Sequence, residues 1–372
     1  MRHLLQKLPI ITSALMAVII LLSTNTALAE MNDETRETLL QNRAKQYQKQ
    51  KQIEYRPSWS FAFDNDVLVP GSRDQDYTYG INLTLAGNQV ENQWASLHRP
   101  LDWINNHIGL ESVIGHNTKA SKIEYGLFGF TPEDKTLTAP QQDDRPYASL
   151  VYVSSTRENY DSLREVSWQS TFTLGVMGLS VVGSLQEAIH SAIGVEGAKG
   201  WDNQISNGGE LTARYSFSRQ GLLARSASGF EVKNTVQGSV GYITEASLSL
   251  SARAGKIRTP WVSFNPELGS YGEKANPNAR VKVSEHYVCA GIAIKYRAYN
   301  AFLEGQFKDS VVTYDGDEIN RAILEAWVGY TLGFDDGYSI TYSIRGHSSE
   351  LKQGKADRNV VWGGLLVSKT FL

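Results

Sequence analysis

Apolar and polar residues alternate along many short stretches of this chain, and this pattern constrains the fold more than any other feature. In SWSFAF, Trp59, Phe61 and Phe63 fall on one face, opposite Ser60 and Ala62. The stretches TYGINLTLA (78–86), SWQSTFTLGV (167–176) and ELTARYSF (210–217) repeat the arrangement. A period of two residues is typical of β-strands that have one apolar and one polar face. The pattern predicts a chain made mostly of β-strands.

A soluble sandwich and a transmembrane barrel both show this alternation, but two features favour the barrel. The polar faces carry small residues and few large charged ones, which suits a crowded lumen. Aromatic residues recur near the predicted strand ends, and the 18 tyrosines outnumber the 12 phenylalanines, as expected at a membrane–water boundary. The first residues are typical of a secretory signal peptide, which supports export of the chain. A basic segment precedes apolar residues 8–22, and Ala27-Leu28-Ala29 matches a signal-peptidase cleavage motif.

We therefore predict an all-β fold, a 12-stranded antiparallel transmembrane β-barrel over residues 58–372 with a short helix in an outer loop. Residues 1–29 form a signal peptide and 30–57 a polar N-terminal extension. An even strand number places both ends on the periplasmic side of the outer membrane. The connections at 87–120 and 255–285 are long for periplasmic turns. The strands are expected near 58–64, 77–86, 121–130, 147–155, 165–177, 209–218, 230–241, 244–254, 286–303, 321–333, 338–347 and 359–371.

The stretch SLQEAIHSAIGVE (184–196) differs from its surroundings and predicts a helix. Ser184 and Glu187 form a capping box, and Gly194 is a natural end. Gln186 and His190 are four residues apart and share one face. An apolar stripe made of Leu185, Ile189 and Ile193 follows a neighbouring face.

The predicted strand directions bring this helix to the same rim as two other segments, the Asp64-Asn65-Asp66 run and Thr78. A neutral histidine is a plausible general base near pH 7, and His190 is the candidate. The developing oxyanion of an ester would need a cation, and the oxygen ligands of Asp64, Asn65, Asp66 and Glu196 suit calcium. If the strand continued through them, Asn65 and Asp66 would point to opposite faces. A bulge or a strand end would remove this conflict.

Four segments resemble a known family, the outer-membrane lipid A 3-O-deacylases of the LpxR type. They are FDND (63–66), DQDYTYGINL (74–83), DDRPYASLVYVS (143–154) and LGVMGLSVVGSLQEAIHSAIGVEGAKGWDNQ (174–204). The resemblance spans about residues 57–372. It implies a twelve-stranded barrel with an active site between the wall and an outer-loop helix. It also implies calcium-dependent hydrolysis of the ester that links the 3-position acyloxyacyl chain of lipid A.

The resemblance also assigns roles to individual residues. His190 becomes the general base, and Asn65 and Asp66 match the family's paired residues near the metal. Thr78 matches the threonine of the DYT motif, and Gln186 and Glu196 match the polar residues beside the histidine. Glu196 would be a metal ligand or an orienting group. Arg145 and Lys135 would contact lipid A phosphates.

The expected partners are lipid A or lipopolysaccharide and the outer membrane, with no nucleic acid because the net charge is -3, and a monomeric state. Two alternatives stay open at this point. The first is a phospholipase of the same barrel type, which would use the same base and cation. The second is a non-catalytic pore or structural barrel, whose lumen would carry more charge.

Overall fold

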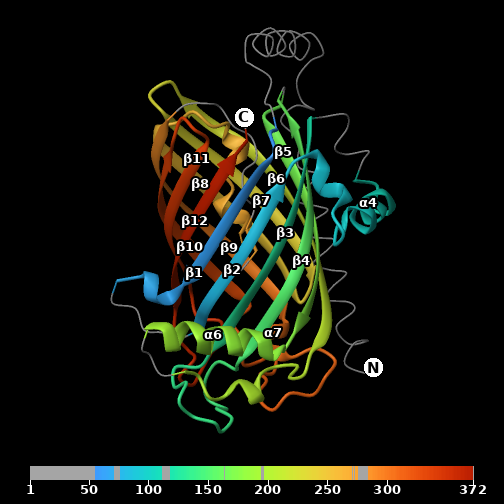
Figure 1. Cartoon of the computed structure of the whole chain (residues 1–372), viewed down its shortest axis with the longest axis vertical. Coiled ribbons are helices and arrows are strands. Elements are labelled where there is room, and N and C mark those ends of the chain that lie inside the picture. The colour runs from blue at the N-terminus through green and yellow to red at the C-terminus, as the bar shows by residue number, and fades with distance from the viewer. Residues whose placement is uncertain are drawn as a thin grey trace.

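A computed structural model describes residues 55–70, 76–110, 118–162, 164–193, 197–269, 271, 273–274 and 284–371. Within this part of the chain, twelve strands close into one antiparallel barrel in sequence order (Figure 1). The strands are β1 Ser58–Asn65, β2 Asp76–Ala86, β3 Thr118–Thr131, β4 Ala148–Asp161, β5 Val166–Met177, β6 Glu210–Ser226, β7 Phe230–Gly241, β8 Ile243–Lys256, β9 Glu285–Asn300, β10 Ala322–Gly333, β11 Tyr338–His347 and β12 Val360–Thr370. The predicted fold class and strand number are confirmed.

The barrel closes where β1 pairs with β12, from Ser58 opposite Thr370 to Asn65 opposite Gly363. β1 starts and β12 ends at one end of the barrel, which we call the terminal end. β1 and β5 finish at the opposite end, which we call the outer rim (Figure 1). The segment after β5 forms α6 Ser180–Ile193 at this rim. The three segments expected to converge there, 64–66, Thr78 and the helix, therefore do so.

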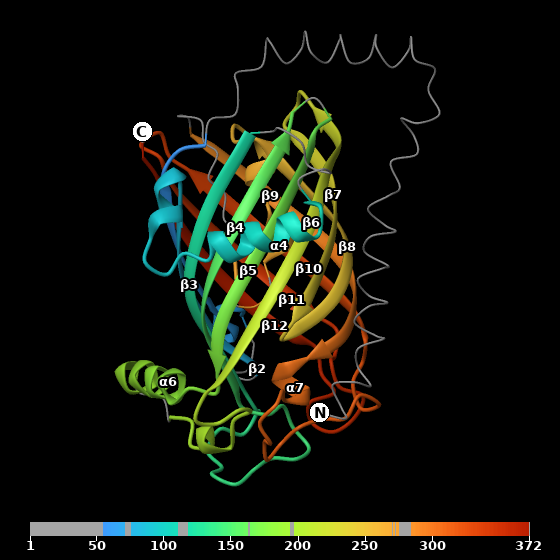
Figure 2. The same cartoon turned by 90° about the vertical axis from the view of Figure 1, so that its right-hand side faces the viewer.

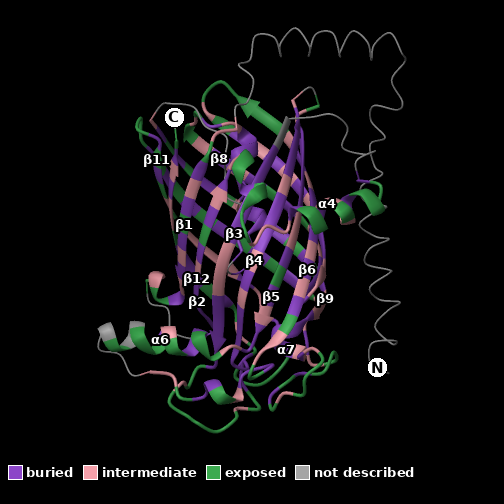
Figure 3. Cartoon of the chain, turned by 45° about the vertical axis from the view of Figure 1, so that its right-hand side comes forward, coloured by how far each residue is buried: buried purple, intermediate pink, exposed green. Residues whose placement is uncertain are grey.

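The alternation that predicted the strands is visible in their burial. Buried and exposed residues alternate without a break along β10, and Figure 3 shows the same banding on its neighbours. The exposed positions of β10 include Leu324, Val328 and Leu332, so the apolar side faces outward. This is the arrangement of a barrel wall in lipid. Among the described residues, no helix has the length and apolar character needed to cross a membrane.

The lumen is far more charged than the sequence pattern led us to expect, so that expectation was wrong. Lys295 pairs with Glu325 at 2.8 Å, and Arg297 pairs with Glu245 at 2.8 Å. Other buried pairs are Lys122–Glu158, Arg253–Glu231 and Lys233–Glu267. The charges are opposite and adjacent, which makes burial tolerable. They lie mostly on β7–β11, beyond the strands whose polar faces looked uncharged.

The long connection between β8 and β9 explains part of this charge, because its described residues lie inside the barrel. We call residues 257–269, 271, 273 and 274 the lumenal segment. Near the terminal end, the hydroxyl of Thr259 donates to Glu285. Further along, Glu267 accepts from Gln220 at 2.7 Å and from Thr235 and Ser251 at 2.8 Å. The segment runs up the lumen toward the outer rim.

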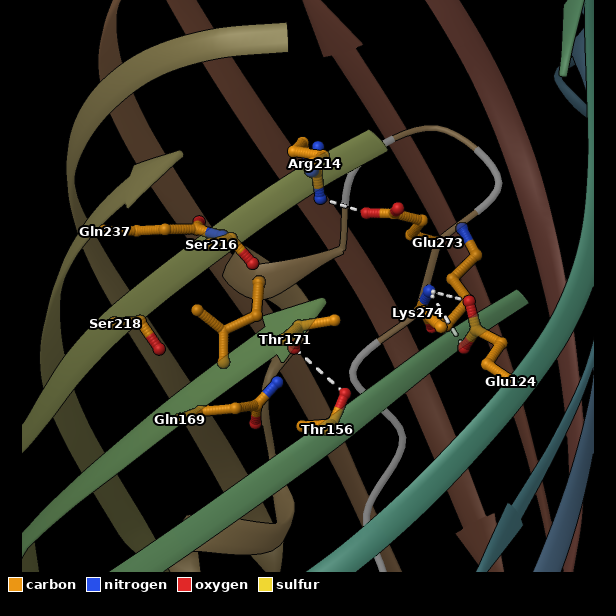
Figure 4. A pocket seen from close by; sticks show the side chains of 12 residues that line it. Glu124, Thr156, Gln169, Thr171, Arg214, Ser216, Ser218, Gln237, Glu273 and Lys274 are labelled. Atoms are coloured by element: carbon orange, nitrogen blue, oxygen red, sulfur yellow. Dashed lines mark hydrogen bonds and ion pairs between the residues drawn. The ribbon is translucent and has the colours of Figure 1, made fainter. Parts of the chain in front are cut away.

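At its far end the lumenal segment is tied to several strands. Glu273 pairs with Arg214 and accepts from Thr173 at 2.8 Å, and the backbone amide of Lys274 donates to Glu124 at 3.1 Å. These groups border a polar cavity of about 20 Å³, room for about one water (Figure 4). The described residues of the long connection thus occupy the lumen of the barrel. The predicted number of strands on either side of it was correct.

The other long connection, between β2 and β3, contains η2 Asn88–Asn92 and α4 His98–His107. Neither element was predicted from the sequence. Figure 2 shows α4 lying across the outside of the barrel wall rather than extending away from it.

Candidate functional site

The helix α6 lies against the outside of the wall at the outer rim, over the first four strands (Figures 1 and 3). Val182 and Trp201 pack with Tyr79 of β2 and with Tyr147 in a buried group that we call the wall cluster. Trp201 begins η3 Trp201–Asn203 in the loop that follows α6. Partly buried side chains that surround the wall cluster are Phe63, Ile81, Leu127, Val151, Leu185 and Ala198. Outward-facing residues of β1 to β4 therefore form the seat of the helix.

Two glycines permit this close approach. A Cβ on Gly129 of β3 would lie 3.0 Å from Trp201 and 3.1 Å from Val182. A Cβ on Gly183, inside α6, would lie only 2.7 Å from Cγ of Trp201. Side chains at either position would push the helix and the indole ring away from the wall. The packing therefore depends on the absence of side chains at both positions.

Polar contacts fix the helix in the same place. The hydroxyl of Tyr79 donates a hydrogen bond to the carbonyl oxygen of Val182. Trp201 Nε1 donates to Gln186 Oε1 at 2.8 Å, and the Gln186 side chain is 1 % exposed. Gln186 Nε2 is also buried and has no hydrogen-bond partner within the described part of the chain. This amide is a buried donor that no described acceptor satisfies.

The helix starts earlier than the capping pattern predicted. It begins at Ser180, so Ser184 lies inside it and does not cap it, and the predicted start was wrong. The last described residue of α6 is Ile193; Gly194 and Glu196 lie outside the described residues. His190 is placed in α6, one turn after Gln186, but its side chain lies outside the described residues. Its contacts stay a prediction.

The Asn65-Asp66 pair lies at a strand end, which removes the conflict with strict alternation. β1 ends at Asn65, and Asp66 starts η1 Asp66–Leu68. Asn65 caps this turn by accepting from the Val67 amide at 2.7 Å, and its Nδ2 donates to the carbonyl oxygen of Thr78 at 2.6 Å. Asp66 is buried. The two side chains therefore belong to one local structure, linked to the start of β2.

Thr78 lies at a β-bulge, because the pairing of β2 with β3 shifts between Tyr77 and Tyr79. Tyr77 packs in the lumen and Tyr79 packs under α6 on the outside. The Thr78 hydroxyl lies 2.6 Å from the hydroxyl of Thr131 and is buried. A bulge redirects side chains locally, and here it is next to the Asn65 contact.

Asp64 does not share the outward site, contrary to the expectation that it supplies a metal ligand there. Its buried carboxylate forms an ion pair with Lys274 of the lumenal segment, and Tyr77 donates to the same oxygen at 3.4 Å. The alternation along β1 places Asp64 on the lumenal face and Asn65 on the outward face. Of the DND run, only Asn65 and Asp66 remain candidates for the outer site.

The donor set that remains is small but chemically consistent. No group of three or more His, Cys, Asp and Glu side chains suited to a metal occurs within the described ranges. The carboxylate of Asp66 and the amide oxygen of Asn65 are hard oxygen ligands, which calcium prefers. These two donors fit calcium, and Glu196 is a further candidate that lies outside the described residues.

Comparison with known proteins places this architecture in a family. A family model described as outer membrane protein LpxR matches residues 16–371. The chain belongs to the LpxR family of outer-membrane proteins. The match starts well before residue 57, where the sequence resemblance was expected to begin, so it covers the whole polar N-terminal extension at residues 30–57. This LpxR-family chain is therefore located in the outer membrane, as predicted.

Solved structures support the fold of this LpxR-family chain. LpxR from Salmonella typhimurium has a TM-score of 0.67 at 16 % identity, over 84 % of this chain and 100 % of that one. The β domain of the Bordetella autotransporter BrkA gives 0.39 at 10 % identity, over 86 % of this chain and 100 % of that one. We draw nothing from the second. No curated protein matches the sequence.

Two residues expected to contact lipid A phosphates occupy different places in this LpxR barrel. Arg145 is 2 % exposed and forms an ion pair with Glu350, with Asp76 3.4 Å away. It is engaged inside the outer rim, a position that gives no support to a phosphate contact. Lys135 lies in the loop between β3 and β4, where its carbonyl oxygen accepts from the Lys199 amide at 2.8 Å. Its loop thus borders the loop that carries Trp201.

Sequence reasoning missed most of the residues that seat the helix. Trp201, Tyr147 and Tyr79 were quoted within the LpxR-like segments but received no role. The GWDNQ run after the helix was the available signal, since a tryptophan in a polar loop has a large apolar surface to bury. The two glycines carried no signal that local pattern could detect.

Proposed function

We propose that this LpxR-family protein is an outer-membrane esterase that hydrolyses the 3-O-linked acyloxyacyl chain of lipid A, with His190 as general base. One observation carries the proposal: α6, which contains Gln186 and His190, is seated on the outer wall at the rim where Asn65, Asp66 and Thr78 lie. Family membership supports the same activity.

The position of the seat favours a substrate that stays in the membrane. The wall cluster lies on the outward face of β1 to β4, which is the face that meets lipid in an outer-membrane barrel. Acyl chains lying along this wall would bring their ester linkages to the rim without leaving the bilayer. Such positioning lowers the entropic cost of the reaction. Lipid A fits because it belongs to the outer leaflet.

In this proposal, His190 takes a proton from a water molecule, which attacks the ester carbonyl carbon. The carbon–oxygen bond to the sugar then breaks, the acyl chain leaves as a carboxylate, and the sugar oxygen receives a proton. The buried Gln186 Nε2 would donate a hydrogen bond to a group on the helix or to the substrate. Calcium, held by Asp66 and Asn65 with Glu196 as a further candidate, would supply positive charge for the oxyanion.

The lumen carries the charge that the sequence analysis associated with a pore, but these charges are paired and the lumen is filled, which argues against a pore. The lumenal segment runs through the barrel, and its polar groups are bonded to surrounding strands at several heights. A water-filled channel would need these contacts to be absent. No comparable observation separates lipid A from a glycerophospholipid as the substrate, so the experiment includes both.

Purified full-length protein is incubated with lipopolysaccharide and, in parallel, with phosphatidylethanolamine, in calcium or in excess chelator. We expect loss of one acyloxyacyl chain from lipid A by mass spectrometry, in calcium only. Fatty acid released from phosphatidylethanolamine alone would establish the phospholipase. Unaltered lipids in both reactions, from a correctly folded barrel, would refute an esterase. A reaction unaffected by chelation would remove calcium from the proposal.

A further inference from the structure

The connection between β2 and β3 folds back onto the outside of the barrel near its terminal end. Its helix, α4, contacts β4 and β5 and lies across the strands (Figure 2). The contacts fall at Ser155 to Arg157 of β4 and at Ser170 of β5. These positions are four to six residues inside the terminal ends of the strands, roughly 13–20 Å along them at about 3.3 Å per residue. The helix therefore lies beside the wall, within the height of the barrel.

The side of this connection that faces the wall buries Leu101 and Leu110 and also carries a well-bonded polar network. Asn105 Nδ2 donates to Ser170 Oγ at 3.0 Å, and the Tyr215 hydroxyl donates to Asn105 Oδ1 at 2.9 Å. Arg157 donates to Asp102 at 2.9 and 2.7 Å and also pairs with Glu91 in η2. Polar groups on the outward face of a barrel are costly in lipid unless they are satisfied. This connection satisfies them.

The side that faces away from the wall carries three exposed large apolar residues among polar ones. Trp94 is 91 % exposed, Trp103 is 61 % exposed and Ile108 is 54 % exposed. The neighbouring residues Arg99 and His107 are exposed as well. Trp103 stacks on His107 with ring centroids 4.1 Å apart. An amphipathic ring with one polar edge is typical of the boundary between headgroups and acyl chains.

We propose that η2 and α4 form a membrane-interface anchor in the periplasmic leaflet, with Trp94, Trp103 and Ile108 inserted among phospholipids at the level of their ester carbonyls. Lipid is the occupant because the exposed face continues the outward surface of the barrel wall, which is already a lipid-facing surface. A helix that lies flat, with hydrogen bonds to the wall on one side and an exposed tryptophan on the other, matches an interfacial helix. The ligand class is glycerophospholipid, and the inference is independent of the proposed enzymatic activity.

Spin labelling tests the proposal on the full-length barrel in phosphatidylcholine–phosphatidylglycerol vesicles. The single native cysteine, Cys289, is buried, so a thiol introduced by Trp103→Cys takes the label. Accessibility to oxygen and to a water-soluble nickel chelate is compared with two controls. Ile292→Cys is on the exposed outward face of β9, and Lys352→Cys is exposed in an outer loop.

We expect the oxygen-to-nickel accessibility ratio at position 103 to be several-fold above that of position 352 and below that of position 292, which lies in the middle of β9. If the Trp103 variant does not assemble, Trp94→Cys serves as the second position, with the same expectation. A ratio equal to that of position 352 would overturn the anchor, because these vesicles contain no other protein to cover the helix. Such a result would make the face a candidate for a periplasmic protein partner.

Discussion

Replacing Gly183 with valine should detach α6 from the wall while leaving the barrel intact. The first added carbon would lie 2.7 Å from Cγ and 2.9 Å from Cδ1 of Trp201, so the indole ring must move. Overpacking of this kind costs about 1–3 kcal/mol. The helix propensity of valine exceeds that of glycine by roughly 0.5 kcal/mol, which offsets a small part of the cost. The remaining penalty falls on docking of the helix, because Gly183 makes no contact needed for strand pairing.

A net penalty of roughly 0.5–2.5 kcal/mol corresponds to about a 2- to 70-fold shift toward the undocked helix. Two readouts apply: acyl release from lipid A, and tryptic cleavage after the exposed Lys199, which should become faster. Val181→Ile is the matched control, since Val181 lies in the same turn and is 51 % exposed. Full activity and unchanged protease resistance in a folded Gly183→Val barrel would refute the idea that seating of α6 limits the reaction.

Two further outcomes are expected. Trp201→Phe removes the donor to the buried Gln186 Oε1, at a cost of about 1–3 kcal/mol. Acyl release should therefore fall, while heat-modifiable migration of the barrel on a gel stays normal. An unchanged rate of acyl release would contradict this expectation. Burial opposes ionisation of Glu350, but Arg145 and Arg297 beside it hold the pKa of its carboxyl well below the ordinary 4.5. The ionised carboxylate therefore contributes its full stabilisation of the fold above about pH 4.5, and this is lost only as pH falls through the lowered pKa. At pH 7, Glu350→Gln should therefore lower the free energy of unfolding by about 3 kcal/mol, a limited loss because each arginine keeps a second carboxylate. An unchanged unfolding midpoint would show that the network adds no stability.

Local pattern predicted the wall of this protein well. The twelve strands were found because alternation has a period of two and needs no knowledge of distant contacts. The largest differences are at strand ends, where β4 continues to Asp161 and β6 to Ser226 as long extensions toward the terminal end. β9 ends at Asn300 instead of 303 because α7 Ala301–Glu304 begins there, with Asn300 as its cap.

Features that depend on distant segments were not predictable in this way. The pairing of Asp64 with Lys274 joins residues 210 positions apart, and only the folded lumenal segment brings them together. The start of α6 was misplaced because Val181, Val182 and Gly183 have weak helix propensity, whereas contact with Tyr79 and Trp201 stabilises the helix there. The lumenal charges were underestimated because their neutralisation is a property of pairs across the barrel.

At the candidate site, the sequence located the participating segments, and the structure shows which of their side chains face outward and which face the lumen. Asn65, Asp66 and Thr78 were expected at one rim with the helix, and the strand end and the bulge explain how adjacent residues meet there. Arg145 was expected to contact lipid A phosphates, but Glu350 binds it inside the rim.

The most direct test of the account is the mass spectrum of lipid A from cells that express the wild-type protein or its His190→Ala variant at equal, folded levels. We predict that wild-type cells lose the mass of one acyloxyacyl chain and that lipid A in the variant keeps it, with no change in barrel assembly. Equal acyl loss in the two strains would contradict the claim that α6 brings the catalytic base to the barrel wall.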